Sequence, residues 1–177
     1  MEAPDEELML AYGRGDAGAF ETLYKRHRGP VYRFVLRAIK NRSTAEELFQ
    51  EVWIRVIEAR SRYAPQARFT TWLYTIAHNL LVDHWRKKGL SLVQLDDEPT
   101  VAAPDNPARQ AEARQSLARL LQALEALPAA QREAFLLHEE AGLSVAEIAA
   151  ATGTNEEAAK SRLRYAMAKL KAAVDDG

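Results

Sequence analysis

The sequence predicts an all-α protein built from two small helical domains joined by an extended acidic linker. Apolar residues recur along most of the chain at the three- and four-residue spacing of a helix, and no stretch alternates as a strand would. This period is lost between residues 89 and 112, where three prolines stand among acidic residues. We therefore expect domains at 1–88 and 113–177, with the linker at 89–112.

The first domain is predicted to be a helical bundle with clearly marked breaks. A short helix, Asp5–Tyr12, leads through a glycine-containing turn to a longer helix that Asp16 can cap. Gly29-Pro30 should interrupt or restart this second helix, because proline lacks the backbone N–H that a helix interior needs.

Residues 45–60 are predicted to form the next helix, preceded by a capping box that begins at Ser43 or Thr44. Its apolar residues almost encircle it, which a lone surface helix would not tolerate. It is therefore either central to the first core or a docking surface for another protein.

The stretch 68–88 reads as one helix with a mixed character. Thr70 or Thr71 can cap its start, and the basic run 86–88 suits the negative end of the helix dipole. One interpretation is an amphipathic core helix with a solvated basic end. The other is a surface for unpaired bases, which stack on flat side chains and bond to amides. The side chains suited to this second role are Phe69, Trp72, Tyr74 and Asn79.

The second domain is predicted to end in a helix-turn-helix. One helix runs to about Leu127, and the next, Ala129–Ala141, ends at Gly142. A capping box, Ser144 with Glu147, then opens a short helix.

Gly153 ends that short helix, and a second capping box, Thr154 with Glu157, opens a basic helix over residues 156–174. A short helix, a glycine-containing turn and a longer basic helix are the parts of a DNA-binding helix-turn-helix. The plainer alternative is a helical hairpin with a solvated charged face.

Bulk composition excludes several functional classes. The chain has 47% hydrophobic residues, 28% charged residues and no cysteine, so it lacks thiolate metal sites and disulfides. Its four histidines are scattered, and no phosphate-binding loop or nucleophile motif occurs. No apolar run is long enough for membrane insertion, and the acidic N-terminus does not resemble a signal peptide. We expect no catalytic residue, no metal site and no cofactor.

Charge is distributed unevenly along the chain. Residues 1–88 carry 15 basic and 11 acidic side chains, residues 89–112 carry 1 and 5, and residues 113–177 carry 8 and 9. A protein that coats duplex DNA alone would be more basic. Any role in nucleic-acid binding should therefore need a partner.

The order of these elements resembles the sigma-70 family, and most closely its small extracytoplasmic-function (group 4) sigma factors of bacterial RNA polymerase. The resemblance spans residues 5–173. It is carried by Glu46-Glu-Leu-Phe-Gln-Glu51, by Phe69-Thr-Thr-Trp-Leu-Tyr-Thr-Ile-Ala-His-Asn79, by Leu127-Pro128 after the linker, and by Lys160-Ser-Arg-Leu163 in the last helix. Each motif alone is weak, and their joint occurrence in order is specific.

The resemblance implies a cytoplasmic sigma factor with three functional surfaces. Helix 45–60 would dock on the clamp helices of the largest polymerase subunit through Glu47, Leu48, Gln50, Glu51 and Trp53. The −10 element would be read and held open by Arg68, Phe69, Trp72, Tyr74, Asn79, Arg86, Lys87 and Lys88. The −35 duplex would be read by Thr154, Asn155, Lys160, Ser161, Arg162, Arg164 and Tyr165. The resemblance also implies contact with the polymerase flap and an anti-sigma partner.

Some residues depart from the family pattern. Leu73 stands where housekeeping sigma factors carry a second adjacent tryptophan, which predicts weaker melting and stricter promoter choice. Glu47 replaces the more usual aspartate, and Tyr165 and Met167 stand where arginines are common. Two other interpretations remain open: an autonomous helix-turn-helix regulator, and an adaptor that binds only polymerase or a regulator.

Overall fold

The computed structural model describes residues 2–89 and 113–175, which form helices and the turns between them. No strand occurs in these two segments, so the all-α prediction is confirmed. Apart from Gly89, the predicted linker lies outside the described residues. In chain order the helices are α1 (Asp5–Gly13), α2 (Ala17–Ile39), α3 (Arg42–Ala59), α4 (Phe69–Lys87), α6 (Ala113–Ala126), α7 (Ala129–Glu139), α8 (Val145–Thr152) and α9 (Glu156–Asp175).

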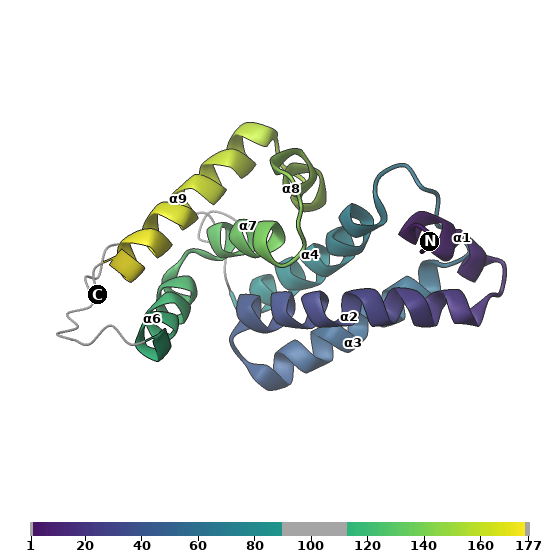
Figure 1. Cartoon of the computed structure of the whole chain (residues 1–177), viewed down its shortest axis with the longest axis horizontal. Helices are drawn as coiled ribbons and strands as arrows, with labels where there is room; N and C mark the ends of the chain where they lie inside the picture. The colour runs from purple at the N-terminus through teal and green to yellow at the C-terminus, as the bar shows by residue number, and fades with distance from the viewer. Residues whose placement is uncertain (1, 90–112, 176–177) are drawn as a thin grey trace.

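The first four helices pack into one bundle, which extends from the centre to the right in Figure 1. Its largest fully buried side chains include Met9, Leu23, Phe34, Leu73 and Leu81. Burial of such side chains removes apolar surface from water and is the main stabilising contribution. Gly13 allows α1 to end against α3, since a Cβ there would lie 2.6 Å from the carbonyl oxygen of Arg60.

Pro30 does not interrupt the second helix, contrary to expectation. Helix α2 runs from Ala17 to Ile39 with the proline inside it. A proline removes one helical hydrogen bond, but the buried residues Leu23 and Val31, on either side of it, pack into the same core. Packing of one continuous apolar face therefore outweighs the local preference of the proline.

Helices α6 to α9 form the second bundle, with α9 packed on α6, α7 and α8. Both hydrogen bonds of the predicted capping box, between Ser144 and Glu147, are present. Gly153 ends α8 in the left-handed conformation, with φ of 67°, which glycine adopts without steric strain. The helix-turn-helix geometry thus follows from local sequence.

Three predicted helix caps differ in the structure. Asn41 caps α3 in place of Ser43 or Thr44, its Oδ1 accepting from the Thr44 N–H at 3.0 Å. Asn155 caps α9 in place of Thr154, accepting from the Ala158 N–H at 2.8 Å. For these two helices the capping residue lies one to three residues from the predicted one, and an asparagine serves equally well as a cap.

The start of α4 is capped by another helix rather than by Thr70 or Thr71. The Phe69 N–H donates to Oε2 of Glu6, in α1, at 2.6 Å. The side chain of Arg68, the N-cap residue of α4, makes no capping hydrogen bond. A carboxylate from a distant segment satisfies the same orphan donor.

Arg132 joins the two bundles from within α7 and is only 5% exposed. Its guanidinium donates to the carbonyl oxygens of Ala38 at 3.3 Å, Glu125 at 3.2 Å and Leu127 at 2.8 Å. A planar group with five donors suits three carbonyls at once.

We expect Arg132→Ala to lower the free energy of unfolding by about 2–4 kcal/mol, because it leaves buried carbonyls without donors. Urea unfolding followed by circular dichroism measures this change. The control is Arg28→Ala, at an exposed position, which should alter stability by less than about 0.5 kcal/mol. Equal stability of the two variants would contradict the assigned role.

Candidate nucleic-acid interface

Helix α4 divides the residues expected at the −10 element into an exposed group and a buried group. Phe69 and Tyr74 are 0% and 1% exposed, so in this structure their rings belong to the core. Trp72 is half-buried. The exposed members of the set are Arg68, Asn79, Arg86, Lys87 and Lys88.

The aromatic rings near the start of α4 form one cluster. The Trp72 ring centroid lies 5.0 Å from that of Tyr63 and 5.7 Å from that of Phe69. Burial, reinforced by the carboxylates of Glu6 and Asp5, raises the pKa of Tyr63 to about 12, so its hydroxyl is neutral. Trp72 is the ring of this trio that keeps partial exposure, with the other two packed beneath it.

Tyr74 lies deeper, with its ring 5.3 Å from the Phe34 ring in an edge-on arrangement. Burial raises the pKa of its hydroxyl, and the hydroxyl oxygen has no hydrogen-bond partner among the described residues. A ring so enclosed can hold α4 on α2 but cannot reach a base without rearrangement.

The end of α4 is strongly basic. Arg86, Lys87 and Lys88 are all exposed, and they lie where cations also stabilise the helix dipole. Burial, together with the charges of Lys88 and Lys87, lowers the pKa of His84, so this histidine adds little charge at neutral pH. The three exposed cations suit contacts to phosphate groups.

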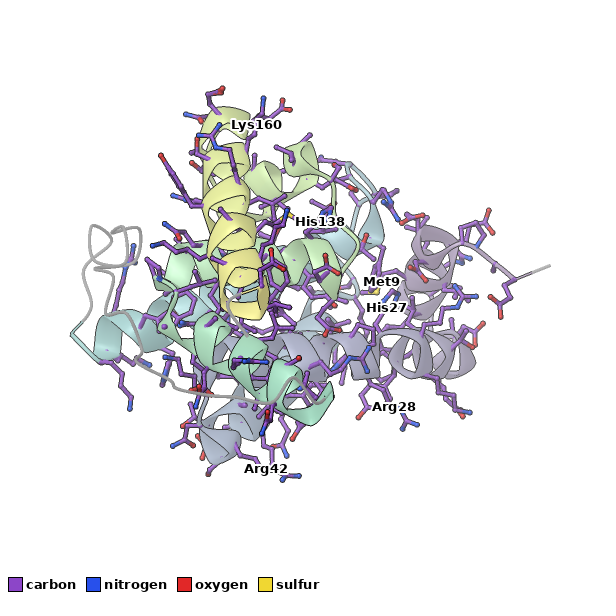
Figure 2. The ribbon with its side chains drawn as sticks, turned by 60° about the vertical axis from the view of Figure 1, so that its left-hand side comes forward. Met9, His27, Arg28, Arg42, His138 and Lys160 are labelled. Atoms are coloured by element: carbon purple, nitrogen blue, oxygen red, sulfur yellow. The ribbon has the colours of Figure 1, made fainter. Side chains whose placement is uncertain are left out.

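Helix α9 presents its expected −35 residues outward. Lys160, Arg164 and Tyr165 are exposed, and the guanidinium of Arg164 lies 5.4 Å from the centre of the Tyr165 ring. Figure 2 shows Lys160 projecting near the beginning of α9, at the edge of the molecule. Among the remaining expected residues, Asn155 is exposed, whereas Thr154, Ser161 and Arg162 are half-buried.

Only some of the expected docking residues lie on the exposed face of α3. Glu47 and Gln50 are exposed, and Leu48 and Glu51 are half-buried. Trp53 is 5% exposed and packs in the core against Tyr24, with ring centroids 5.0 Å apart. In this structure Trp53 therefore supports the helix from below.

Two residues on the outer side of α3 were not among the expected site residues. Ile54 and Ile57 are 46% and 38% exposed. Isoleucine is most often buried, and two exposed isoleucines one helical turn apart are typical of a contact surface. Ile54 is four residues from Gln50 and seven from Glu47, so the three share one helix face. That spacing was a signal available in the sequence.

The structure also joins α4 to the second bundle through contacts that the sequence did not indicate. Helix α8 packs on α4, and Glu147 accepts from Arg68 at 3.2 Å and from the Thr71 hydroxyl at 3.2 Å. A cleft of about 440 Å³ lies between the two parts, with Asn79 and Arg86 on one wall and Thr154 and Arg162 on the other. Expected −10 and −35 residues thus meet in one cleft.

No described helix is both long enough and apolar enough to cross a membrane.

Comparisons with known proteins identify the family. Residues 23–90 match the family described as Sigma-70 region 2, and residues 117–170 match Sigma-70, region 4. The chain is 38% identical to RNA polymerase sigma factor CarQ of Myxococcus xanthus over 168 residues, covering 92% of this chain and 93% of CarQ.

It is also 34% identical to the ECF RNA polymerase sigma factor BldN of Streptomyces coelicolor, covering 90% of this chain but 61% of BldN. Among solved structures, CnrH in complex with the cytosolic domain of CnrY superposes with a TM-score of 0.71 at 26% identity, covering 97% of each chain. The chain therefore belongs to the extracytoplasmic-function sigma factors of the sigma-70 family, which direct promoter-specific transcription initiation by RNA polymerase.

Proposed function

We propose that this sigma factor uses three separate surfaces: α3 to dock on core polymerase, α4 to capture the −10 element as an unpaired strand, and α9 to read the −35 element as duplex. The observation that carries the proposal is the exposure of all three surfaces on helices that are otherwise packed into their bundles. In this proposal the first domain recognises the single strand and the second domain recognises the duplex.

The outer face of α3 fits a protein partner. It combines the aliphatic Ile54 and Ile57 with the polar Glu47 and Gln50, which is the mixture of apolar centre and polar rim found at interfaces. We assign it to the clamp helices of the largest subunit. Trp53 and the buried part of Leu48 would hold the face in place.

The exposed side of α4 fits an unpaired strand. Trp72 offers a partly exposed ring for stacking, Asn79 an amide for a base edge, and the basic run 86–88 contacts to phosphate. Capture of a base outside the stack offsets the few kcal/mol of lost stacking. Phe69 and Tyr74 would act through the packing of α4.

The outer face of α9 fits the major groove. In a helix-turn-helix the first turns of the second helix reach base edges, and Lys160, Ser161 and Arg164 lie in those turns. Tyr165 can contact bases or sugar. Thr154 and Asn155 lie at the turn, and Arg162 lines the same cleft as Thr154, so we assign these three residues to phosphate contacts.

We expect Lys160→Ala to reduce transcription from −35-dependent promoters about 5- to 100-fold, because a base or phosphate contact of a lysine contributes about 1–3 kcal/mol. Binding of the −10 strand to the first domain should not change. Abortive transcription on promoters with and without a −35 element measures the difference. The control is Lys171→Ala, an exposed lysine three turns further along α9, and equal effects of both substitutions would contradict the assignment.

Gel shift with a promoter fragment separates the proposal from its two alternatives. With core polymerase the protein should form a specific complex, and alone at physiological salt it should not. Specific binding by the free protein would favour an autonomous regulator. Binding to polymerase without promoter recognition would favour an adaptor.

We further propose that a second protein regulates this sigma factor in the cytoplasm by binding to it directly. CnrH, the solved structure described above, is bound to the cytosolic domain of CnrY. An anti-sigma factor of this kind would act by covering the surfaces assigned to polymerase and DNA.

A further inference from the structure

Helix α1 joins the start of α4 to α2 through two neighbouring carboxylates (Figure 1). Glu6 accepts a hydrogen bond from the Phe69 N–H at 2.6 Å. Asp5 accepts from Arg26 and from the His27 ring, each at 2.9 Å. Burial acts to raise the pKa of Asp5, but the hydrogen bonds from His27 and Arg26 outweigh it and hold that pKa below its usual value. Asp5 is therefore charged at neutral pH and fixes α1 on α2.

Glu6 supplies a cap that α4 does not supply for itself. The first N–H groups of a helix have no partner within the helix, and the side chain of the N-cap residue, Arg68, makes no capping bond. The Thr70 hydroxyl has no hydrogen-bond partner among the described residues, and the Thr71 hydroxyl donates to Glu147. The ordering of the first turn of α4 therefore depends on a carboxylate from α1.

The capped residue, Phe69, supports the ring that we assign to strand capture. The Phe69 ring centroid lies 5.7 Å from that of Trp72 and 5.4 Å from that of His27. Glu6 thus holds the backbone of Phe69, while Asp5 holds the histidine on which the Phe69 ring packs. Both carboxylates of α1 fix the residue that lies beneath Trp72.

The loop that precedes α4 has few other anchors. Its backbone hydrogen bonds span only two or three residues, from Arg62 to Ala59 and from Gln66 to Ala64. Tyr63 is 8% exposed and packs its ring 5.0 Å from the Trp72 ring. The cap at the end of the loop is therefore one of two attachments, with the Tyr63 ring, that set the position of Trp72.

We infer that Glu6 is a positioning residue for capture of the −10 strand: its cap at Phe69 holds the first turn of α4 and the Trp72 ring in the arrangement that receives an unpaired base. In this role Glu6 acts through α4 and does not itself contact DNA. A site that is ordered in advance loses less conformational entropy when it binds, so loss of the cap should weaken strand capture and leave docking through α3 intact. The inference rests on the proposed function in taking Trp72 as a strand contact.

The order of the Trp72 ring can be measured in the free protein. The chain has three tryptophans, and Trp53 and Trp85 are each 5% exposed. Quenching of tryptophan fluorescence by iodide therefore reports mainly on Trp72, which is half-buried. Glu6→Ala should increase the iodide quenching constant, because an uncapped first turn opens more often.

Promoter opening measures the functional effect in the holoenzyme. Glu6→Ala should slow open-complex formation on a duplex promoter about 3- to 30-fold, the range expected for loss of a helix cap. Affinity for core polymerase should not change. Glu6→Gln should retain most of the opening rate, because its amide oxygen can still accept from the Phe69 N–H.

Met9→Val is the control for a general weakening of α1. Met9 is fully buried in the same helix, and shortening its side chain lowers stability without removing a hydrogen bond. Both variants are compared at a temperature where circular dichroism shows them folded. Met9→Val should leave iodide quenching and the opening rate close to those of the unmodified protein.

Unchanged iodide quenching in folded Glu6→Ala would overturn the inference, and so would equal slowing of promoter opening by Met9→Val. A Glu6→Gln variant as slow as Glu6→Ala would also overturn it. If Glu6→Ala does not fold, Glu6→Asp gives the same comparison, since its shorter side chain keeps the charge but withdraws the oxygens from Phe69.

Trp72→Ala separates failure of the inference from failure of the proposed function. Normal promoter opening by Trp72→Ala would contradict the proposed role of α4 and, with it, the inference. Slow opening by Trp72→Ala together with normal opening by Glu6→Ala would contradict the inference alone. The quenching measurement involves neither DNA nor polymerase, so its result does not depend on the proposed function.

Discussion

Ile54→Arg should reduce binding to core polymerase by at least about 30-fold and reduce transcription in proportion. The side chain is 46% exposed in the middle of the outer face of α3, and a buried interface centre that receives an unpaired charge typically loses 2 kcal/mol or more. Because the side chain is exposed, the fold should remain intact. Binding is measured by fluorescence anisotropy with labelled sigma factor and purified core enzyme.

Two controls define the effect of Ile54→Arg. The conservative Ile54→Leu should bind core polymerase almost normally, and Val174→Arg, which places the same charge at an exposed aliphatic position of α9, should also bind. The pair Gln50→Ala and Glu51→Ala should weaken core binding on the same face. Normal core binding by Ile54→Arg would show that α3 is not part of the docking surface.

Asn79→Ala should slow open-complex formation about tenfold or more while leaving core binding intact. The amide is exposed on α4, and loss of a base-edge contact in a capture pocket costs about 1–3 kcal/mol. Potassium permanganate reactivity of unpaired thymines measures the opening rate.

The matched control for Asn79→Ala is Gln122→Ala, which removes an exposed amide from α6. It should open promoters normally. A promoter with a pre-formed bubble at the −10 element should partly rescue Asn79→Ala, because melting no longer depends on capture. Release of the variant from polymerase would show instead that Asn79 faces the docking surface.

Local features of the fold could be predicted from the sequence. The capping box of Ser144 and Glu147 and the turn at Gly153 both involve residues a few positions apart, and the chemistry of such short segments is largely independent of the rest of the chain. The same is true of the cap at Asp16. This locality is why the helix-turn-helix and the order of helices were predictable.

Features that depend on tertiary packing could not be predicted. Phe69, Trp72 and Tyr74 look equivalent in the sequence, and only the packing of α4 on α1 and α2 separates the half-buried ring from the two buried ones. The cap that Glu6 supplies to α4 spans 63 residues. Pro30 was misjudged for the same reason, since the continuous core outweighs a local preference.

The contacts between the domains could not be predicted from the sequence for a further reason. The Arg33–Glu140 pair spans 107 residues, and either charge alone is typical of a solvated helix surface. Glu147 was assigned only its local role in the capping box. Its second role depends on how the domains meet, which no spacing within one helix encodes.

Run-off transcription with purified core polymerase, this protein and a library of promoter fragments tests most directly whether the chain acts as a sigma factor. We predict transcripts that start at one class of promoter, only when protein and core enzyme are mixed, and that are lost with Ile54→Arg. Transcripts that are equally abundant without the protein, or equally abundant with Ile54→Arg, would contradict this prediction.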